Sequence, residues 1–336
     1  MPLKKPLLSL KNYNRTSKTF CPTPAAVMDI GTNTIRLLIG CVKEGKVMRL
    51  ATNRTVTRLG KDILKTGKLS RQNIIKSIKC MVDFKEICNE YGAKEIRAVG
   101  TSALREAKNS NEFLAHAKKI AGIDIDIISG AKEAELTLKG VLGAGVGSQG
   151  SRKKELERFF IVDIGGGSTE WIFYKGSNTI MNSIPIGAVK LFDAFIKHDP
   201  PTPDELRRMK GYIKKAFSKS LSLNNIFTNH SPLNFIATGG TAATLAAIDI
   251  GMDKYDGDKV HLHKTTLPAL KSMYEKIIML SAHERTKIKG LEAERTDIII
   301  PGILILLTFM EKLGAKNFIM SDYGLLEGSL ISYHML

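Results

Sequence analysis

The chain has 336 residues, enough for about two domains of roughly 150 residues each. Hydrophobic residues make up 43% of it and charged residues 25%, a composition that excludes a disordered or collagen-like protein. Its 50 lysines and arginines against 33 acidic residues leave a net charge of +17. Such a surplus favours polyanionic partners: nucleic acids, acidic membrane surfaces or phosphate-rich small molecules.

The first 20 residues are distinct, because they carry five basic residues and no acidic one. They contain no apolar stretch of signal-peptide length, so we do not expect secretion. A basic start of this kind weakly resembles an organelle transit segment, but frayed termini are more common. We therefore predict a frayed basic tail over residues 1–20.

Cysteine content and the apolar runs bear on compartment and membrane contact. The spacing of the four cysteines contains no Cys-x-x-Cys pair, so we expect neither a disulfide framework nor a zinc site. Reduced thiols in a cytoplasmic protein are the expected state. The apolar run 298–310 is too short for a bilayer, which needs about 20 residues. We predict a buried helix there and no membrane partner. The cysteines are Cys21, Cys41, Cys80 and Cys88.

An internal repeat is the most informative feature of the chain. Residues 26–40 predict a strand, an Asp-x-Gly turn and a second strand, and residues 160–174 repeat this unit 134 positions later, counted from Asp29 to Asp163. A hairpin signal follows each unit, at 43–46 and at 175–178. One unit repeated once at domain-sized separation indicates two similar lobes.

Helices and strands alternate in the rest of the chain. Helical spacing of apolar residues predicts helices over 70–90 and 111–121, and a helix with a capping box begins at 202. Strands are predicted at 95–99, 125–128, 235–237 and 318–320. This alternation predicts an α/β fold whose sheets are covered by helices.

The glycine-rich turns predict phosphate binding. Glycines allow backbone N–H groups to approach phosphate oxygens, and a carboxylate at a strand end can hold Mg²⁺ or a water. Asp29 and Asp163 stand at two such turns, and 239–240 is a third glycine turn that opens a helix. The alternative is a set of plain β-turns whose aspartates bond local amides. The repetition of the turns favours phosphate binding.

Five segments together resemble one known family. They are 29–34 (DIGTNT), 100–105 (GTSALR), 163–170 (DIGGGSTE), 238–241 (TGGT) and 321–328 (SDYGLLEG). In this order they are similar to the exopolyphosphatase / guanosine pentaphosphate phosphohydrolase (Ppx/GppA) family, from about residue 25 to the C-terminus. The resemblance implies two ribonuclease H-like lobes, as in actin and the sugar kinases, with the active site between them. It also implies Mg²⁺-dependent release of the terminal phosphate of linear polyphosphate, or conversion of guanosine pentaphosphate to tetraphosphate.

The resemblance also assigns roles and a domain division. Glu133 takes the place of the family's general base, where it would accept a proton from the attacking water. We expect the N-terminal lobe over 21–130 together with a C-terminal helix at about 325–336, and the C-terminal lobe over 131–324. The expected metal ligands are Asp163, Glu170 and Asp29. The expected phosphate-binding residues are Gly31, Thr32, Asn33, Arg58, Arg105, Gly165, Gly166, Gly167, Ser168, Gly239 and Gly240.

Two departures from the family pattern keep a second hypothesis open. Lys132 replaces an acid beside the base position, and Leu326 stands where we expect an arginine in many relatives. They allow a catalytically weak sensor of polyphosphate or of an alarmone. A nucleic-acid partner ranks last, because the basic segments lack the interleaved aromatics of a stacking platform. The chain stops at 336, without the all-helical part of longer relatives, which favours short polyphosphate chains or nucleotide substrates. A homodimer is left open.

Overall fold

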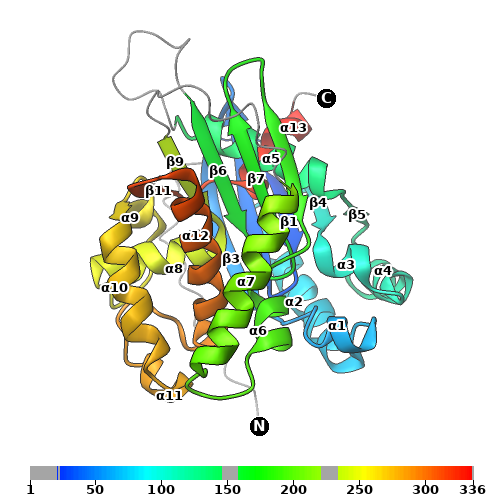
Figure 1. Ribbon diagram of the computed structural model, residues 1–336. Coiled ribbons are helices and arrows are strands. Elements are labelled where there is room, and N and C mark those ends of the chain that lie inside the picture. Colours follow the sequence, from blue (N-terminus) through cyan, green and yellow to red (C-terminus); the bar gives the residue numbers. More distant parts are fainter. Residues whose placement is uncertain (1–20, 22, 146–157, 221–233, 335–336) are drawn as a thin grey trace.

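The computed structural model describes residues 21, 23–145, 158–220 and 234–334. The predicted basic tail over 1–20 lies outside the described residues. The α/β prediction is confirmed: two mixed sheets alternate with helices in two lobes (Figure 1). The strands of the first lobe form one sheet. They are β1 (Ala25–Ile30), β2 (Thr34–Lys43), β3 (Lys46–Val56), β4 (Glu95–Gly100) and β5 (Ile125–Ile127).

The second sheet repeats the first. The first sheet has the order β3-β2-β1-β4-β5, in which β1, β2 and β3 are antiparallel and β4 and β5 run parallel to β1. The second has the order β10-β11-β9-β6-β7-β8, in which β6 takes the place of β1. The internal repeat thus gives five strands of the second sheet, β8-β7-β6-β9-β11, the order of the first sheet, and β10 adds a sixth strand antiparallel to β11. The strands are β6 (Phe159–Ile164), β7 (Thr169–Tyr174), β8 (Ile180–Ile184), β9 (Asn234–Thr238), β10 (Lys264–Thr266) and β11 (Asn317–Ser321).

Helices cover both faces of each sheet. Between the sheets, α5 packs on β6, β7 and β8, α13 packs on β1, β2 and β3, and the two helices contact each other. The outer flanks carry α1–α4 on one side and α8–α11 on the other (Figure 1). In chain order the helices are α1 (Ile63–Thr66), α2 (Arg71–Glu90), α3 (Ser102–Glu106), α4 (Ser110–His116), the π-helix Ala117–Ala121, α5 (Gly130–Gly143), α6 (Ala188–Phe195), α7 (Pro203–Ser220), α8 (Gly239–Ile250), α9 (Gly257–Val260), α10 (Leu267–Ile278), α11 (Ala282–Arg285), the 3₁₀-helix Ala293–Arg295, α12 (Ile299–Leu313) and α13 (Leu325–His334).

Several local predictions are confirmed by the capping groups. The Ser70 side chain accepts a hydrogen bond from the Asn73 amide and begins α2. At the start of α7, Thr202 and Glu205 bond each other's backbone amides, which is the predicted capping box. The apolar run at 298–310 forms the buried α12. No helix in the described part of the chain is long and apolar enough to cross a membrane.

The central strands β1 and β6 are buried along their whole length. Alternate residues of β1 face opposite helices: Met28 packs toward α2, whereas Val27 packs toward α13. On β6, Ile161 packs against α5, in one cluster with Ala134 and Val141. Since side chains alternate, Asp29 and Asp163 share the faces of Val27 and Ile161. Both carboxylates therefore point into the layer between the sheets.

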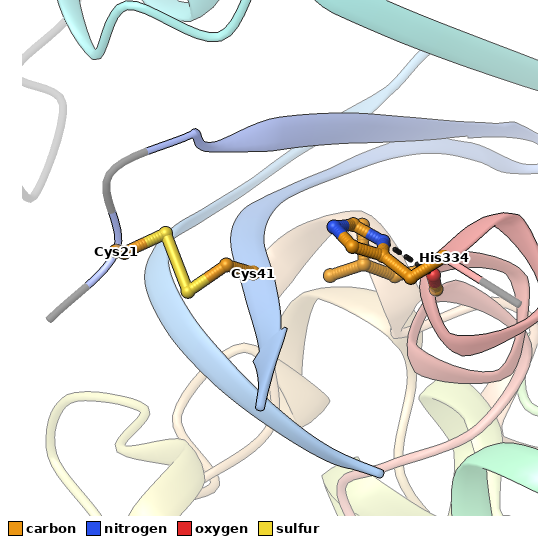
Figure 2. The surroundings of a disulfide bond; sticks show 4 residues. Cys21, Cys41 and His334 are labelled. Atoms are coloured by element: carbon orange, nitrogen blue, oxygen red, sulfur yellow. Dashed lines mark hydrogen bonds between the residues drawn. A yellow bond between two sulfur atoms is a disulfide. The ribbon is translucent and has the colours of Figure 1, made fainter. Parts of the chain in front are cut away.

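The expectation of four reduced thiols is wrong for one pair. Cys21 and Cys41 form a disulfide across 20 residues, with their Cα atoms 5.9 Å apart (Figure 2). The register of β1 on β2 pairs Ala25 with Gly40, so the segment before β1 lies beside the end of β2. This proximity comes from the hairpin and leaves no Cys-x-x-Cys signal. Cys80 and Cys88 are free and buried in α2.

Candidate active site

The first glycine turn holds a carboxylate that is only half satisfied. Asp29 ends β1, and its Oδ2 accepts hydrogen bonds from the Arg36 guanidinium at 2.9 and 2.7 Å. Among the described residues, Asp29 Oδ1, Thr32 Oγ1 and Asn33 Oδ1 are buried and have no hydrogen-bond partner. Buried polar atoms are nearly always paired, so three such atoms on one turn form a group suited to binding a polar ligand or a water.

The second turn carries an acidic pair in the equivalent place. Asp163 ends β6, and Glu170 lies opposite it on β7. Both are buried, at 7% and 1% exposure. The Ser183 hydroxyl donates to Glu170 Oε1 at 2.6 Å, and the Thr137 hydroxyl lies 3.5 Å from Asp163 Oδ2. Two acids thus lie at one strand end, where hydroxyl groups orient them and neither forms an ion pair with another described residue.

The two turns touch across the boundary of the lobes. A Cβ added to Gly167 would lie 2.5 Å from Thr32 Oγ1 and from Ser102 Oγ, both on the first lobe. Only glycine allows this approach, because Cβ atoms are essentially never found so close to another atom. The predicted meeting of the two Asp-x-Gly units is therefore present in the structure.

The third glycine turn closes the site from the second lobe. Gly239 has a φ of +83°, which favours glycine, and a Cβ there would lie 2.3 Å from Asp163 Oδ1. A Cβ on Gly240 would lie 2.3 Å from the Arg295 guanidinium. This turn thus lies between the acidic strand end and Arg295, the last residue of the 3₁₀-helix.

Glu133 lies in the first turn of α5, after the N-cap Ser129. Its side chain is buried, and Arg105 donates to Glu133 Oε2 at 2.9 Å. The pKa of Glu133 is raised to about 7: burial raises it most and Asp29 and Asp163 add to this, whereas Arg105 lowers it. A carboxyl group with a pKa near neutrality is suited to accept a proton.

The neighbouring acids Asp163 and Glu170 also have raised pKa values. Burial raises the pKa of Glu170 well above its usual value, and Glu133 and Asp163 add to this effect. The pKa of Asp163 is raised as well, first by burial, against the lowering effect of Arg36. In the described ranges no group of three or more His, Cys, Asp or Glu side chains is arranged to hold a metal ion. A cation here would therefore need oxygen ligands from a substrate or from water.

Two arginines that the sequence reading overlooked lie in the same region. Burial lowers the pKa of the Arg36 guanidinium, but Asp29 and Asp163 raise it more, so its net pKa is above the usual value. Burial and the nearby Arg36 lower the pKa of Arg295 to about 10. Arg36 had a signal in the repeat, because it follows Asp29 by the same seven positions as Glu170 follows Asp163. Arg295 had no such signal.

Three residues singled out from the sequence have other contacts. Arg58 donates to Asp297 Oδ2 at 2.7 Å, across the lobes. Lys132 bonds Glu135 on the exposed face of α5. Leu326 is buried and packs with Leu330 against the first sheet. Neither Lys132 nor Leu326 contributes to the cluster around Glu133.

The comparisons with known proteins agree with this geometry. The family model described as "Ppx/GppA phosphatase family" matches residues 38–335. The chain belongs to this family. The predicted phosphohydrolase class is thereby confirmed, and Glu133 and the glycine turns at 165–168 and 239–240 lie within the matched residues.

Relatives and solved structures within the Ppx/GppA family cover nearly the whole chain. "Exopolyphosphatase 2" of Mycobacterium tuberculosis is 27% identical over 92% of this chain and 98% of its own length. The "Guanosine-5'-triphosphate,3'-diphosphate pyrophosphatase" of Vibrio cholerae is 29% identical over 90% of this chain, but over only 58% of its own length. A crystal structure of the Aquifex aeolicus family member is 31% identical, covers 93% of this chain and 98% of that one, and has a TM-score of 0.74.

Proposed function

We propose that this protein releases the terminal orthophosphate of linear polyphosphate, with guanosine pentaphosphate as a second substrate. The observation that carries the proposal is the position of Glu133. It is a buried carboxyl group with a pKa of about 7, held by Arg105 between two glycine turns that touch each other. Such a group accepts a proton at neutral pH more readily than an exposed glutamate does.

The phosphates are bound by amides, hydroxyls and guanidinium groups of both lobes. The residues of the first turn (31–33) and of the second turn (165–168) receive the terminal phosphate, together with the third turn at 239–240. Arg36, Arg105 and Arg295 neutralise its charge, since guanidinium groups bind phosphate oxygens well. Arg58 joins them only if its bond to Asp297 opens.

Hydrolysis then proceeds by attack of a water on the terminal phosphorus. Glu133 accepts a proton from this water while the new P–O bond forms, and the bond between phosphorus and the bridging oxygen breaks. The bridging oxygen leaves with its electron pair as the new end of the shortened chain. Arg105 orients the Glu133 carboxylate. Most of the acceleration comes from stabilising the charge of the transition state.

Magnesium fits the acidic side of the site. The unpaired Asp29 Oδ1 and the raised pKa values of Asp163 and Glu170 reflect buried negative charge that a divalent cation would neutralise. Mg²⁺ is commonly held by one or two carboxylates together with substrate phosphates and waters, which suits a site without three converging ligands. Bound there, Mg²⁺ would screen the charge of the phosphate oxygens. Of the proposed ligands Asp163, Glu170 and Asp29, one or two would bind the ion directly and the rest through water.

Polyphosphate is the favoured substrate because this chain covers nearly the full length of a relative named as an exopolyphosphatase. The M. tuberculosis exopolyphosphatase is covered over 98% of its length, whereas the V. cholerae pyrophosphatase is covered over 58%. The sensor alternative rested on Lys132 and Leu326, and neither side chain contacts the proposed site. We therefore retain an enzyme as the function.

A phosphate-release assay tests the proposal. The protein is incubated with Mg²⁺ and, side by side, short polyphosphate, long polyphosphate, guanosine pentaphosphate or ATP. We expect release from polyphosphate to be fastest. Binding of polyphosphate without release in any of these reactions would support the sensor instead, and faster release from guanosine pentaphosphate would reverse the order of the two substrates.

A further inference from the structure

A buried lysine joins the two lobes beside the proposed site. Lys190 lies on α6 of the second lobe, and only 5% of its side chain is exposed. Its ammonium group donates to Glu106 Oε1, on α3 of the first lobe, at 2.6 Å. A buried ammonium group needs a partner of opposite charge, so separation of the lobes would leave Lys190 without this one.

The same carboxylate connects to the second glycine turn. The Ser102 hydroxyl donates to Glu106 Oε1 at 2.7 Å, and Ser102 is one of the residues that a Cβ on Gly167 would strike. On the other side, the Lys190 amide donates to the Gly166 carbonyl at 3.2 Å. Lys190 therefore links the Gly166–Gly167 turn, through its backbone amide, to Glu106 of α3, through its side chain.

Glu106 also follows Arg105, which holds Glu133. Both Arg105 and Glu106 line a cavity of about 330 Å³, which Ser168 borders from the second lobe. About one third of the Glu106 side chain is exposed there. A free carboxylate at this place would repel a phosphate chain, and the Lys190 charge cancels that repulsion.

We propose that Lys190 and Glu106 form an inter-lobe clamp that holds α3, and with it Arg105, in a fixed position relative to the second glycine turn. Lys190 also neutralises the charge of Glu106 beside the cavity that Arg105 and Glu106 line. Both are positioning residues, since they act through Arg105 and the turn. The catalytic consequence rests on the proposed function, whereas the mechanical consequence does not. The two can therefore be tested separately.

The first experiment measures phosphate release from a short polyphosphate by four variants. Lys190→Met leaves Glu106 unneutralised, so we expect KM to rise about tenfold or more and kcat to fall. Adding Glu106→Gln to this variant removes the repulsion, so KM should return to within about threefold of the wild-type value while kcat stays low. Lys190→Arg keeps the charge and should retain most of kcat. The matched control is Lys271→Met, which breaks an exposed pair with Glu311 and should change neither constant.

The second experiment needs no substrate. Hydrogen–deuterium exchange of the ligand-free protein should become at least about threefold faster at 101–106 and 165–168 in Lys190→Met, but not in Lys271→Met. Unchanged exchange in both segments would overturn the clamp, whatever the activity. Equal KM values for the single and the double variant would overturn the neutralising role. A wild-type protein that releases no phosphate would instead contradict the proposed function, and the exchange result would still decide the clamp.

Discussion

The two Asp-x-Gly hairpins share one backbone arrangement but differ in charge. In the first lobe Asp29 pairs in register with Arg36, and the two form an ion pair of 2.7 Å. In the second lobe Asp163 pairs in register with Glu170, and both acids have raised pKa values. One strand end is therefore close to neutral and the other carries excess buried acid.

This difference suggests a division of roles between repeated units. The first hairpin presents a guanidinium group to an anion, whereas the second presents oxygen ligands to a cation. A phosphate chain with its counter-ion has both charges, so a cleft between two such hairpins is complementary to it. Glu133 interacts with both hairpins: burial is the main cause of its raised pKa, and Asp29 and Asp163 add to it.

The largest expected effect is the loss of the proton acceptor Glu133. Glu133→Gln keeps the size of the side chain but removes its basicity. We expect phosphate release to fall by about 10²–10⁴-fold, the usual contribution of a general base. Polyphosphate affinity, measured by calorimetry without turnover, should stay within about threefold, because Gln keeps the bound charge pattern apart from one acid. A variant that retains its activity would remove Glu133 from the mechanism.

A pair of substitutions separates the two hairpins. Arg36→Met should weaken phosphate binding and raise KM for polyphosphate by about 10–100-fold, with the Mg²⁺ requirement little changed. Glu170→Gln should do the reverse, raising the Mg²⁺ concentration needed for half-maximal activity by about 10–100-fold. Both titrations are read from initial rates, and direct Mn²⁺ binding followed by electron paramagnetic resonance checks the second. Equal responses of the two variants would contradict the division of roles.

The acidic excess should also make the ligand-free protein sensitive to pH. The pKa of Glu133 in the folded protein is about 7, above its usual 4.5, so the folded state binds more protons than the unfolded state between these values. Its contribution to stability is complete below pH 4.5 and is lost as the pH rises through 7, by up to about 3 kcal/mol. Glu133→Gln should therefore be more stable than the wild type at pH 8, by roughly 1–2 kcal/mol after the loss of the Arg105 pair. At pH 5 the two should unfold alike. Chemical denaturation at both pH values measures this, and a gain of equal size at pH 5 would assign it to another cause.

Much of the fold could be predicted from the sequence, because its signals are local. The repeat predicted two similar lobes, apolar spacing predicted the helix at 70–90, and the capping box predicted the helix start at 202; the structure has all three. The disulfide between Cys21 and Cys41 could not be predicted, since it depends on where the hairpin register brings the segment before β1.

The site was predictable only in part, for the same reason. Asp29 and Asp163 end strands that the sequence reveals, so their meeting follows from the repeat. Arg295 and Lys190 carry no motif, and their contacts arise from the packing of the second lobe on the glycine turns and on α3. The family resemblance identified Glu133 as the candidate base. The buried environment of Glu133 could not be predicted, because it is formed by residues far away in the chain.

The smallest expected effect concerns the charge next to Glu133. Lys132 is half-exposed and pairs with Glu135, so it contributes to the general positive field rather than to a contact in the site. Lys132→Ala should change kcat by less than about twofold and reduce the rate on long polyphosphate only at low salt, where the field is not screened. Rates measured from about 20 to 300 mM salt should converge for variant and wild type. A variant whose deficit persists at high salt would give Lys132 a direct contact with the substrate and would extend the phosphate-binding side of the cleft along α5.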